Sequence, residues 1–160
     1  MFNKMKFNIF QKIIKKIIAI FFYFKFVKSY NLSFYQAEQE EKYKLIDLDR
    51  NLGLQKLNQL KKTYSFLDYG MSSEHQTLFC SFSEKKNLLI KNILEIGTYD
   101  AKSAFLLSKL FPDSKIDTID LEDNNEIFKK SYSRDDENLR TRFIEERNKL
   151  LEKSKNINFI

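Results

Sequence analysis

A glycine and an aspartate, each at the end of a short apolar segment, carry the chemistry that this sequence could perform. Gly97 follows the segment 93–96, and Asp120 follows the segment 115–119, 23 residues after Gly97. Glycine has no Cβ, so the backbone can turn tightly beside a ligand. In nucleotide-binding β-α-β units, an acid about 20 residues after such a glycine accepts hydrogen bonds from ribose hydroxyls. The pair therefore predicts a site for a ribose-containing cofactor.

The spacing of the glycines argues against a dinucleotide as that cofactor. The fingerprint G-x-G-x-x-G would need glycines at 97, 99 and 102, but the chain has Gly97, Tyr99 and Lys102. Without the second and third glycines, a pyrophosphate could not approach the helix N-terminus closely. An NAD-dependent enzyme is therefore disfavoured.

The elements that must position Gly97 and Asp120 follow from the apolar pattern around them. The segments 93–96 and 115–119 are typical of short buried parallel strands. Apolar residues at helical spacing from Ala104 to Phe111 predict a helix between them, which ends before Pro112. Ligands of open α/β sheets bind outside the carboxyl ends of the strands, so we expect the glycine and the acid to meet there.

Two segments resemble the first two motifs of class I S-adenosylmethionine-dependent methyltransferases. They read ILEIGTYDAKS at 93–103 and DTID at 117–120. The first motif of that family is acid-x-Gly-x-Gly-x-Gly, and Glu95 and Gly97 match its beginning. Asp120 matches the acid that ends the family's second strand and holds the adenosyl ribose.

The first motif departs from the family at two positions. Tyr99 and Ala101 stand where the second and third glycines would be. Branches similar to caffeoyl-CoA and sugar O-methyltransferases use a Gly-Thr-x-x-Gly-x-Ser turn, which Gly97, Thr98 and Ser103 suit. Alanine is the smallest replacement for glycine, so we expect weakened cofactor binding rather than none.

The resemblance implies S-adenosyl-L-methionine as the cofactor and methyl transfer as the reaction. It also implies a set of cofactor contacts: Glu95 at the methionyl end, Gly97, Thr98, Tyr99 and Ser103 along the turn, Asp120 on the ribose and Leu121 beside the adenine. The methyl acceptor stays open, with small hydroxylated molecules or saccharides as the family's precedent. The competing interpretation is an ordinary β-α-β unit that binds no ligand.

The fold class implied by the resemblance is α/β, a Rossmann-like methyltransferase sheet preceded by N-terminal helices. A helix over about 135–155 and a strand beginning at Asn156 would complete three strands, after which we expect the sheet to be truncated. The family's full sheet has seven strands, with the fourth beside the first. The first strand would then have an open apolar edge, which favours self-association into a homo-oligomer.

Catalytic residues of the family lie largely beyond the third strand, so the catalytic residues here are unknown. Glu74 and His75 are candidates because they precede the first motif, although a lone histidine is more often structural. Cys80 sits among apolar residues with no cluster of metal ligands around it, which predicts a buried structural thiol and no metal site. A single cysteine also suits a reducing, cytoplasmic location.

The net charge of +6 belongs to the N-terminal segment, residues 1–37. Seven of the 28 basic residues and none of the 22 acidic residues lie there, so the remainder has 21 basic against 22 acidic residues. A nucleic-acid-binding domain would spread basic residues over its folded face, so we expect no nucleic-acid partner. Three interpretations of the segment stay open: a basic amphipathic helix on the inner face of a membrane, a helix packed on its own domain, and an uncleaved signal anchor.

The amphipathic interpretation rests on apolar residues at three- and four-residue spacing: Phe10, Ile13, Ile14, Ile17, Phe21 and Phe24.

Residues 38–91 are expected to form a helical lead-in, in which Gly53 predicts either two short helices or one weakened helix. A turn is expected at 68–70 and a helix capped by Ser72 or Ser73 after it. The domain that carries the chemistry is then 92–160. Two alternative functions accompany the methyltransferase: a truncated fragment without activity, and a membrane-surface interaction protein that keeps a β-α-β remnant.

Overall fold

The computed structural model describes residues 16–18, 20–21, 32–68, 73–131 and 134–160. The chain divides into two compact units, Met1–Leu45 and Ile46–Ile160. The first contains helix α2 (Leu32–Leu45), and the described residues among 16–21 are also helical. Most of the amphipathic helix predicted within residues 1–37 lies outside the described residues. None of the helices that the structure describes is long and apolar enough to cross a membrane.

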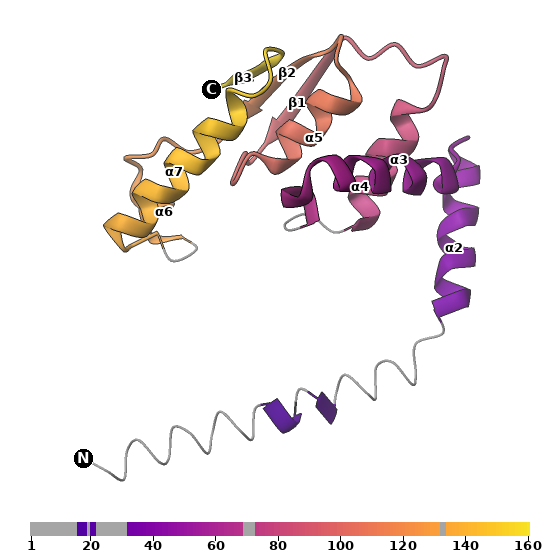
Figure 1. Ribbon diagram of the computed structural model, residues 1–160, viewed down its shortest axis with the longest axis horizontal. Coiled ribbons are helices and arrows are strands. Elements are labelled where there is room, and N and C mark those ends of the chain that lie inside the picture. Colours follow the sequence, from indigo (N-terminus) through magenta and orange to yellow (C-terminus); the bar gives the residue numbers. More distant parts are fainter. Residues whose placement is uncertain (1–15, 19, 22–31, 69–72, 132–133) are drawn as a thin grey trace. The chain divides into compact units, whose positions relative to one another are not determined.

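The second unit contains the sheet and all helices after α2 (Figure 1). In chain order its elements are α3 (Arg50–Thr63), the 3₁₀ helix η1 (Ser65–Asp68), α4 (Ser73–Ser83), β1 (Asn92–Ile96), α5 (Lys102–Leu110), β2 (Lys115–Ile119), α6 (Glu126–Lys130), α7 (Glu137–Leu151) and β3 (Ile157–Phe159).

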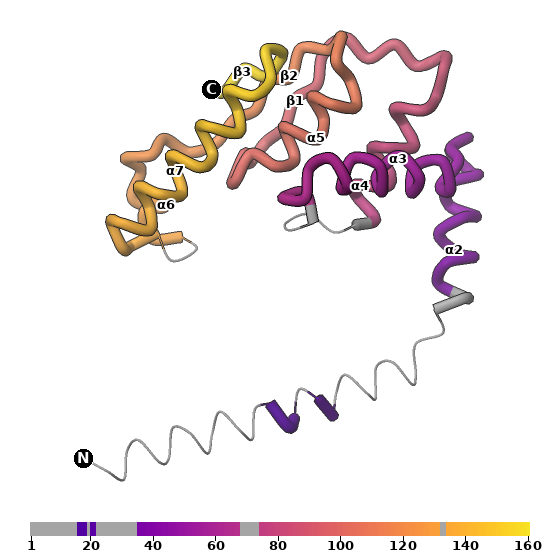
Figure 2. The backbone as a smooth tube through the Cα atoms, in the orientation of Figure 1, coloured from indigo at the N-terminus to yellow at the C-terminus, as the bar shows by residue number. Residues whose placement is uncertain are grey.

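The three strands form one parallel sheet in the order β1-β2-β3. In its register Ile93 lies beside Ile116, and Glu95 lies beside Thr118. The path in Figure 2 runs along β1, back through α5 and along β2, then back through α7 to β3. The predicted α/β class, the β-α-β unit and the third strand are therefore confirmed.

The two faces of this sheet differ in what covers them. Helices α5 and α7 pack on one face, where Ile116 and Thr118 of the central strand are fully buried (Figure 1). Side chains alternate along a strand, so Leu94 and Ile96 point to the other face, where they are 61% and 82% exposed. Strand β1 lies at one edge of the sheet. Within the described residues, the apolar edge expected from the sequence is present.

Helix α5 joins the sheet to the helices that precede it. Six of its nine residues are buried, and Phe105 is at the centre of an aromatic cluster. The Phe105 ring lies 5.1 Å from the ring of Tyr64 and 5.2 Å from that of Phe66, both in edge-on contact. The core of the unit therefore lies on the helical side of the sheet, where Leu106 and Leu110 of α5 are surrounded by Leu57, Leu67, Cys80 and Leu150.

The lead-in helices pack closely because of Gly53. The helical pattern breaks at 46–49, where Asp49 caps α3 by accepting hydrogen bonds from the backbone N–H groups of Asn51 and Leu52. Two short helices are therefore present, as one of the two alternatives predicted, but the break between them is not at Gly53, which lies inside α3 and faces α4. A Cβ at Gly53 would come within 2.0 Å of the Ser81 hydroxyl and 2.6 Å of the Thr77 carbonyl.

Two other local predictions have mixed outcomes. Helix α4 is confirmed and begins at Ser73, whereas Ser72 lies outside the described residues. Of the turn expected at 68–70, only Asp68 is described, as the last residue of η1, and the other two positions lie outside the described residues. The short helix α6 was not predicted. Asn125 begins it, accepting a hydrogen bond from the Ile127 N–H at 2.8 Å.

Replacing Gly53 by alanine tests the close packing of α3 on α4. In an open helix this change would stabilise the protein, because alanine is the better helix former. Here we expect the added methyl to lower the free energy of unfolding by about 1–3 kcal/mol, as overpacking does. Chemical denaturation measures the change. Asn58→Ala, on an exposed position of the same helix, is the control and should be neutral or slightly stabilising. A Gly53→Ala variant as stable as this control would contradict the packing.

Candidate functional site

The turn between β1 and α5 is left-handed at three alternate positions. Gly97 has φ = 92°, Tyr99 has φ = 46° and Ala101 has φ = 61°. L-residues rarely adopt such angles, and each non-glycine residue there costs roughly 1–2 kcal/mol. These are the positions at which the resembling methyltransferase motif has its three glycines. The backbone of this turn therefore has the conformation that glycine would favour, even where tyrosine and alanine occupy it.

Hydrogen bonds to the end of β2 hold this turn in place. The backbone N–H groups of Gly97 and Thr98 donate to the carbonyl of Ile119, at 2.7 and 3.3 Å. The Tyr99 N–H donates to Oδ2 of Asp120 at 2.8 Å. The strained turn is thus fastened to the neighbouring strand at three successive residues. The predicted meeting of the glycine turn with the strand-end acid is present in the structure.

Asp120 keeps capacity for a ligand while it holds the turn. Its Oδ1 accepts a hydrogen bond from the N–H of Leu121 at 2.8 Å, in addition to the bond from Tyr99. An ionised carboxylate can accept about four hydrogen bonds, so further donors can still bind. Asp120 is half-buried and Leu121 is 42% exposed. The carboxylate is therefore fixed in orientation and reachable from solvent.

The space beside Gly97 is open. A Cβ built on Gly97 would meet no atom within 4 Å. The glycine is therefore not required by packing within the described residues, in contrast to Gly53. Its positive φ and this open space leave room for a ligand to approach the backbone closely.

A chain of buried hydroxyl groups lies beneath the turn and ends at Glu95. The Thr118 hydroxyl donates to Oε2 of Glu95 at 2.5 Å, and the Thr98 and Thr118 hydroxyls are 2.6 Å apart. Because the single Thr118 proton goes to the carboxylate, Thr98 must be the donor to Thr118. The side chain of Thr98 thus points into the protein, and the part of this residue available to a ligand is its backbone.

The side chain of Glu95 points to the helix-covered face of β1. The predicted site residue Ser103, near the start of α5, forms a hydrogen bond to it there. Burial raises the pKa of the Glu95 carboxyl above its ordinary value of 4.5. Hydrogen bonds from Ser103 and Thr118 oppose that shift without cancelling it. Ser103 therefore acts on the carboxylate rather than in the open space beside Gly97. Sequence reasoning missed Thr118, whose signal is a hydroxyl residue at an inward position of a buried strand, two residues before the ribose acid.

The ring of Tyr99 is directed toward α7. It lies 5.4 Å from the ring of Phe143, and the guanidinium of Arg134 lies 5.9 Å from it on another side. Arg134 in turn stacks on Phe128 at 3.9 Å. Tyr99 therefore presents its backbone to the turn and its side chain to the helices.

The two candidate catalytic residues lie on α4 in different surroundings. Glu74 forms a two-point ion pair with Arg50 of α3, with distances of 3.0 and 2.9 Å. This pair is mostly buried and ties α3 to α4, which gives Glu74 a structural role. His75 is exposed.

The remaining sequence predictions concern cysteine and metal. Cys80 is fully buried, as predicted, and burial raises its pKa to about 11. A thiol with that pKa is protonated near neutral pH and is a poor nucleophile. In the part of the chain that the structure describes, no three His, Cys, Asp or Glu residues gather to hold a metal ion.

Comparison with known proteins does not assign a family. No protein-family model matches the chain. No curated protein gives a significant match. The function therefore has to be argued from the turn, the acid and the geometry that joins them.

The raised pKa of Glu95 predicts how stability depends on pH. The folded state binds this proton more tightly than the unfolded state, so the contribution of Glu95 to stability falls as pH rises above about 4.5. A glutamine at this position would not titrate. We therefore expect the free energy of unfolding of Glu95→Gln, relative to that of wild type, to increase as pH rises from 4.5 toward neutrality, so that the variant becomes relatively more stable.

Denaturant titrations of both proteins at several pH values measure this difference. Glu122→Gln, at an exposed position, is the control for the change in net charge. A Glu95→Gln difference that is constant with pH, or that changes in the opposite direction, would contradict the assigned burial of the carboxyl.

Proposed function

We propose that the chain binds S-adenosyl-L-methionine at the turn 97–101 and Asp120, and that it serves a methyl-transfer reaction. The observation that carries this proposal is the left-handed backbone at 97, 99 and 101. The methyltransferase motif places glycines at these three positions, and here the same backbone is kept at tyrosine and alanine, although it costs free energy there.

Three of the predicted contacts, at Asp120, Gly97 and Leu121, have a physical basis in the site. The Asp120 carboxylate has acceptor capacity for ribose hydroxyls, and the open space at Gly97 allows the backbone to approach the methionyl part. Leu121 offers an exposed apolar side chain for one face of the adenine. Glu95 acts from below, by holding Thr118 and through it Thr98, rather than by direct contact.

S-adenosyl-L-methionine would supply an electrophilic methyl group bonded to a positively charged sulfur. The part that these residues play is to bind and orient that group at the carboxyl ends of β1 and β2. An acceptor hydroxyl would also need a base, and no residue here is assigned that role. A small hydroxylated molecule or a saccharide stays the proposed acceptor class, on the resemblance alone.

Calorimetric titration with S-adenosyl-L-methionine tests the cofactor site. We expect saturable binding by the full chain and a loss of about 10- to 100-fold in affinity in Asp120→Ala, because hydrogen bonds to a charged group are removed. Asp113→Ala is the matched control. Asp113 is an exposed aspartate between α5 and β2, near the start of β2, and its removal should leave affinity unchanged.

Two results would overturn the proposal. One is no binding by wild-type protein that circular dichroism shows to be folded, which would favour the alternative of a β-α-β unit without a ligand and without activity. The other is equal loss of affinity in Asp120→Ala and Asp113→Ala, which would indicate a nonspecific effect of charge.

A second proposed function is peripheral contact with the inner, cytoplasmic face of a membrane. The supporting observation is that Ile17, Ile20 and Phe21 are 60%, 56% and 65% exposed. They lie in a segment with seven lysines and no acidic residue. Exposed apolar side chains together with lysines are the combination that binds an anionic lipid surface.

Vesicle flotation of the full chain tests membrane contact. We expect wild type to float with vesicles that contain phosphatidylglycerol and to float less with phosphatidylcholine alone. Ile17→Ser/Phe21→Ser should lose most of this binding. The matched control, Ile127→Ser/Leu139→Ser, changes two apolar residues of similar exposure elsewhere and should retain it. Equal flotation of the two double variants would contradict a role for the N-terminal segment.

A further inference from the structure

A cavity of about 470 Å³ lies on the helical side of the sheet, between η1, the start of α5 and α7. Tyr99 and Asp100 of the turn contribute to its wall, but Gly97, Asp120 and Leu121 do not. Its volume is in the range of small-molecule sites, which is about 300–1,000 Å³. The cavity is therefore large enough for a ligand, and it shares with the proposed cofactor site only Tyr99 and Asp100 of the turn.

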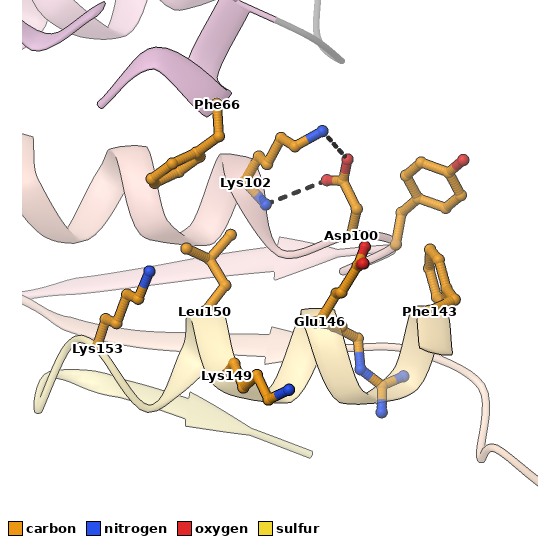
Figure 3. Close-up of a pocket in the computed structure, with 10 residues that line it drawn as sticks. Phe66, Asp100, Lys102, Phe143, Glu146, Lys149, Leu150 and Lys153 are labelled. Atoms are coloured by element: carbon orange, nitrogen blue, oxygen red, sulfur yellow. Dashed lines mark hydrogen bonds and ion pairs between the residues drawn. The ribbon is translucent and has the colours of Figure 1, made fainter. Parts of the chain in front are cut away.

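The apolar part of the cavity wall comes from two elements. Phe66 of η1 and Leu150 of α7 line it, with Phe143 further along α7 (Figure 3). Leu150 is nearly fully buried, so its position is fixed by the core. A flat apolar group could contact the Phe66 ring and Leu150 together, and such contacts supply most of the affinity of small-molecule sites.

Most charged groups in the wall already have a partner. Arg147 forms a two-point ion pair with Asp123 at 2.8 and 2.9 Å. The Lys102 ammonium lies 2.8 Å from Asp100, as the dashed line in Figure 3 shows. Their charges are therefore compensated within the protein.

Glu146 of the wall is also paired, since its carboxylate lies 2.8 Å from Arg142 outside the cavity. The acidic side of the cavity thus offers no charge that would call for a cationic ligand.

Two lysines in the wall are different. The Lys149 side chain is 72% exposed, and its ammonium is 3.9 Å from Glu145, at the limit of an ion pair. The Lys153 ammonium lies over the Phe66 ring at 5.5 Å and, within the described residues, forms no ion pair. Both lie near the C-terminal end of α7, about one helical turn apart in sequence. The helix dipole favours lysines there, but it does not account for an aromatic-lined hollow beside them.

We propose that this cavity binds a small organic anion, with a flat apolar body against Phe66 and Leu150 and its anionic group at Lys149 and Lys153. A carboxylate, sulfonate or phosphate monoester would serve equally at the two ammonium groups. The site does not depend on the proposed cofactor function, because it shares no residue with the Asp120 carboxylate or the open space at Gly97.

Calorimetric titration of the full chain with 2-naphthoate, an aromatic ring system with one carboxylate, tests the site. We expect saturable binding of one molecule, and about tenfold weaker binding in Lys149→Gln/Lys153→Gln because two cationic contacts are lost. Lys62→Gln/Lys86→Gln removes two exposed lysines outside the cavity and should bind as wild type does. Glu146→Gln, which removes a negative charge from the wall, should bind about threefold more tightly.

Two further variants separate this site from others. Leu121→Ser, which removes the apolar side chain proposed for the adenine and keeps the bond from Tyr99 to Asp120, should bind 2-naphthoate as wild type does, so that failure of the cofactor site and failure of this one can be told apart. Ile96→Ser tests the open face of the sheet as a competing apolar site and should also have no effect. The proposal is overturned by no saturable binding to folded wild type, by equal losses in the two lysine pairs, or by loss of binding in Ile96→Ser.

Discussion

Burial of α5 on almost all sides is the constraint from which the site follows. One side of α5 meets the sheet and the other meets the lead-in helices, and six of its nine residues are excluded from water. A helix held from both sides cannot shift to relieve strain at its first turn. The chain must therefore pass from the end of β1 into α5 along a fixed and short path. Left-handed backbone at Gly97, Tyr99 and Ala101 is the result.

Hydrogen bonds to the end of β2, rather than glycines at positions 99 and 101, offset the free-energy cost of the left-handed backbone in that turn. The carbonyl of Ile119 and the carboxylate of Asp120 together accept three N–H groups from the turn. Asp120 therefore has a structural duty that exists without any ligand. This duty and ribose binding are compatible, because a carboxylate held by backbone donors is already oriented and needs no rearrangement to accept a hydroxyl.

The charged side chains of the unit Ile46–Ile160 fall into two groups: those in ion pairs that stabilise the fold, and those that a ligand could contact. Arg50 is mostly buried and pairs with Glu74 between α3 and α4, and Arg147 of α7 is buried and pairs with Asp123 of the β2–α6 loop, each through two hydrogen bonds. Breaking such a pair would leave a buried charge without compensation. Lys149 and Lys153 lie at the surface beside an apolar hollow, and among the residues that the structure describes neither forms a two-point ion pair of this kind. A ligand can therefore interact with Lys149 and Lys153 without breaking a two-point ion pair that stabilises the fold.

The sequence by itself determined the order of the elements and the position of the chemistry. Short apolar segments that end at Gly97 and Asp120, and a helix that ends before Pro112, are local signals. They predict a β-α-β unit, in which the carboxyl ends of the two parallel strands lie at the same edge of the sheet. Only the tertiary structure decided what individual residues do. Gly53 was predicted to interrupt or weaken a helix, yet it permits the contact of α3 with α4. Thr118 was not predicted as a site residue, yet it links Glu95 to Thr98. These roles depend on neighbours about 20 or more residues away in the chain, and local sequence patterns carry no information about such contacts.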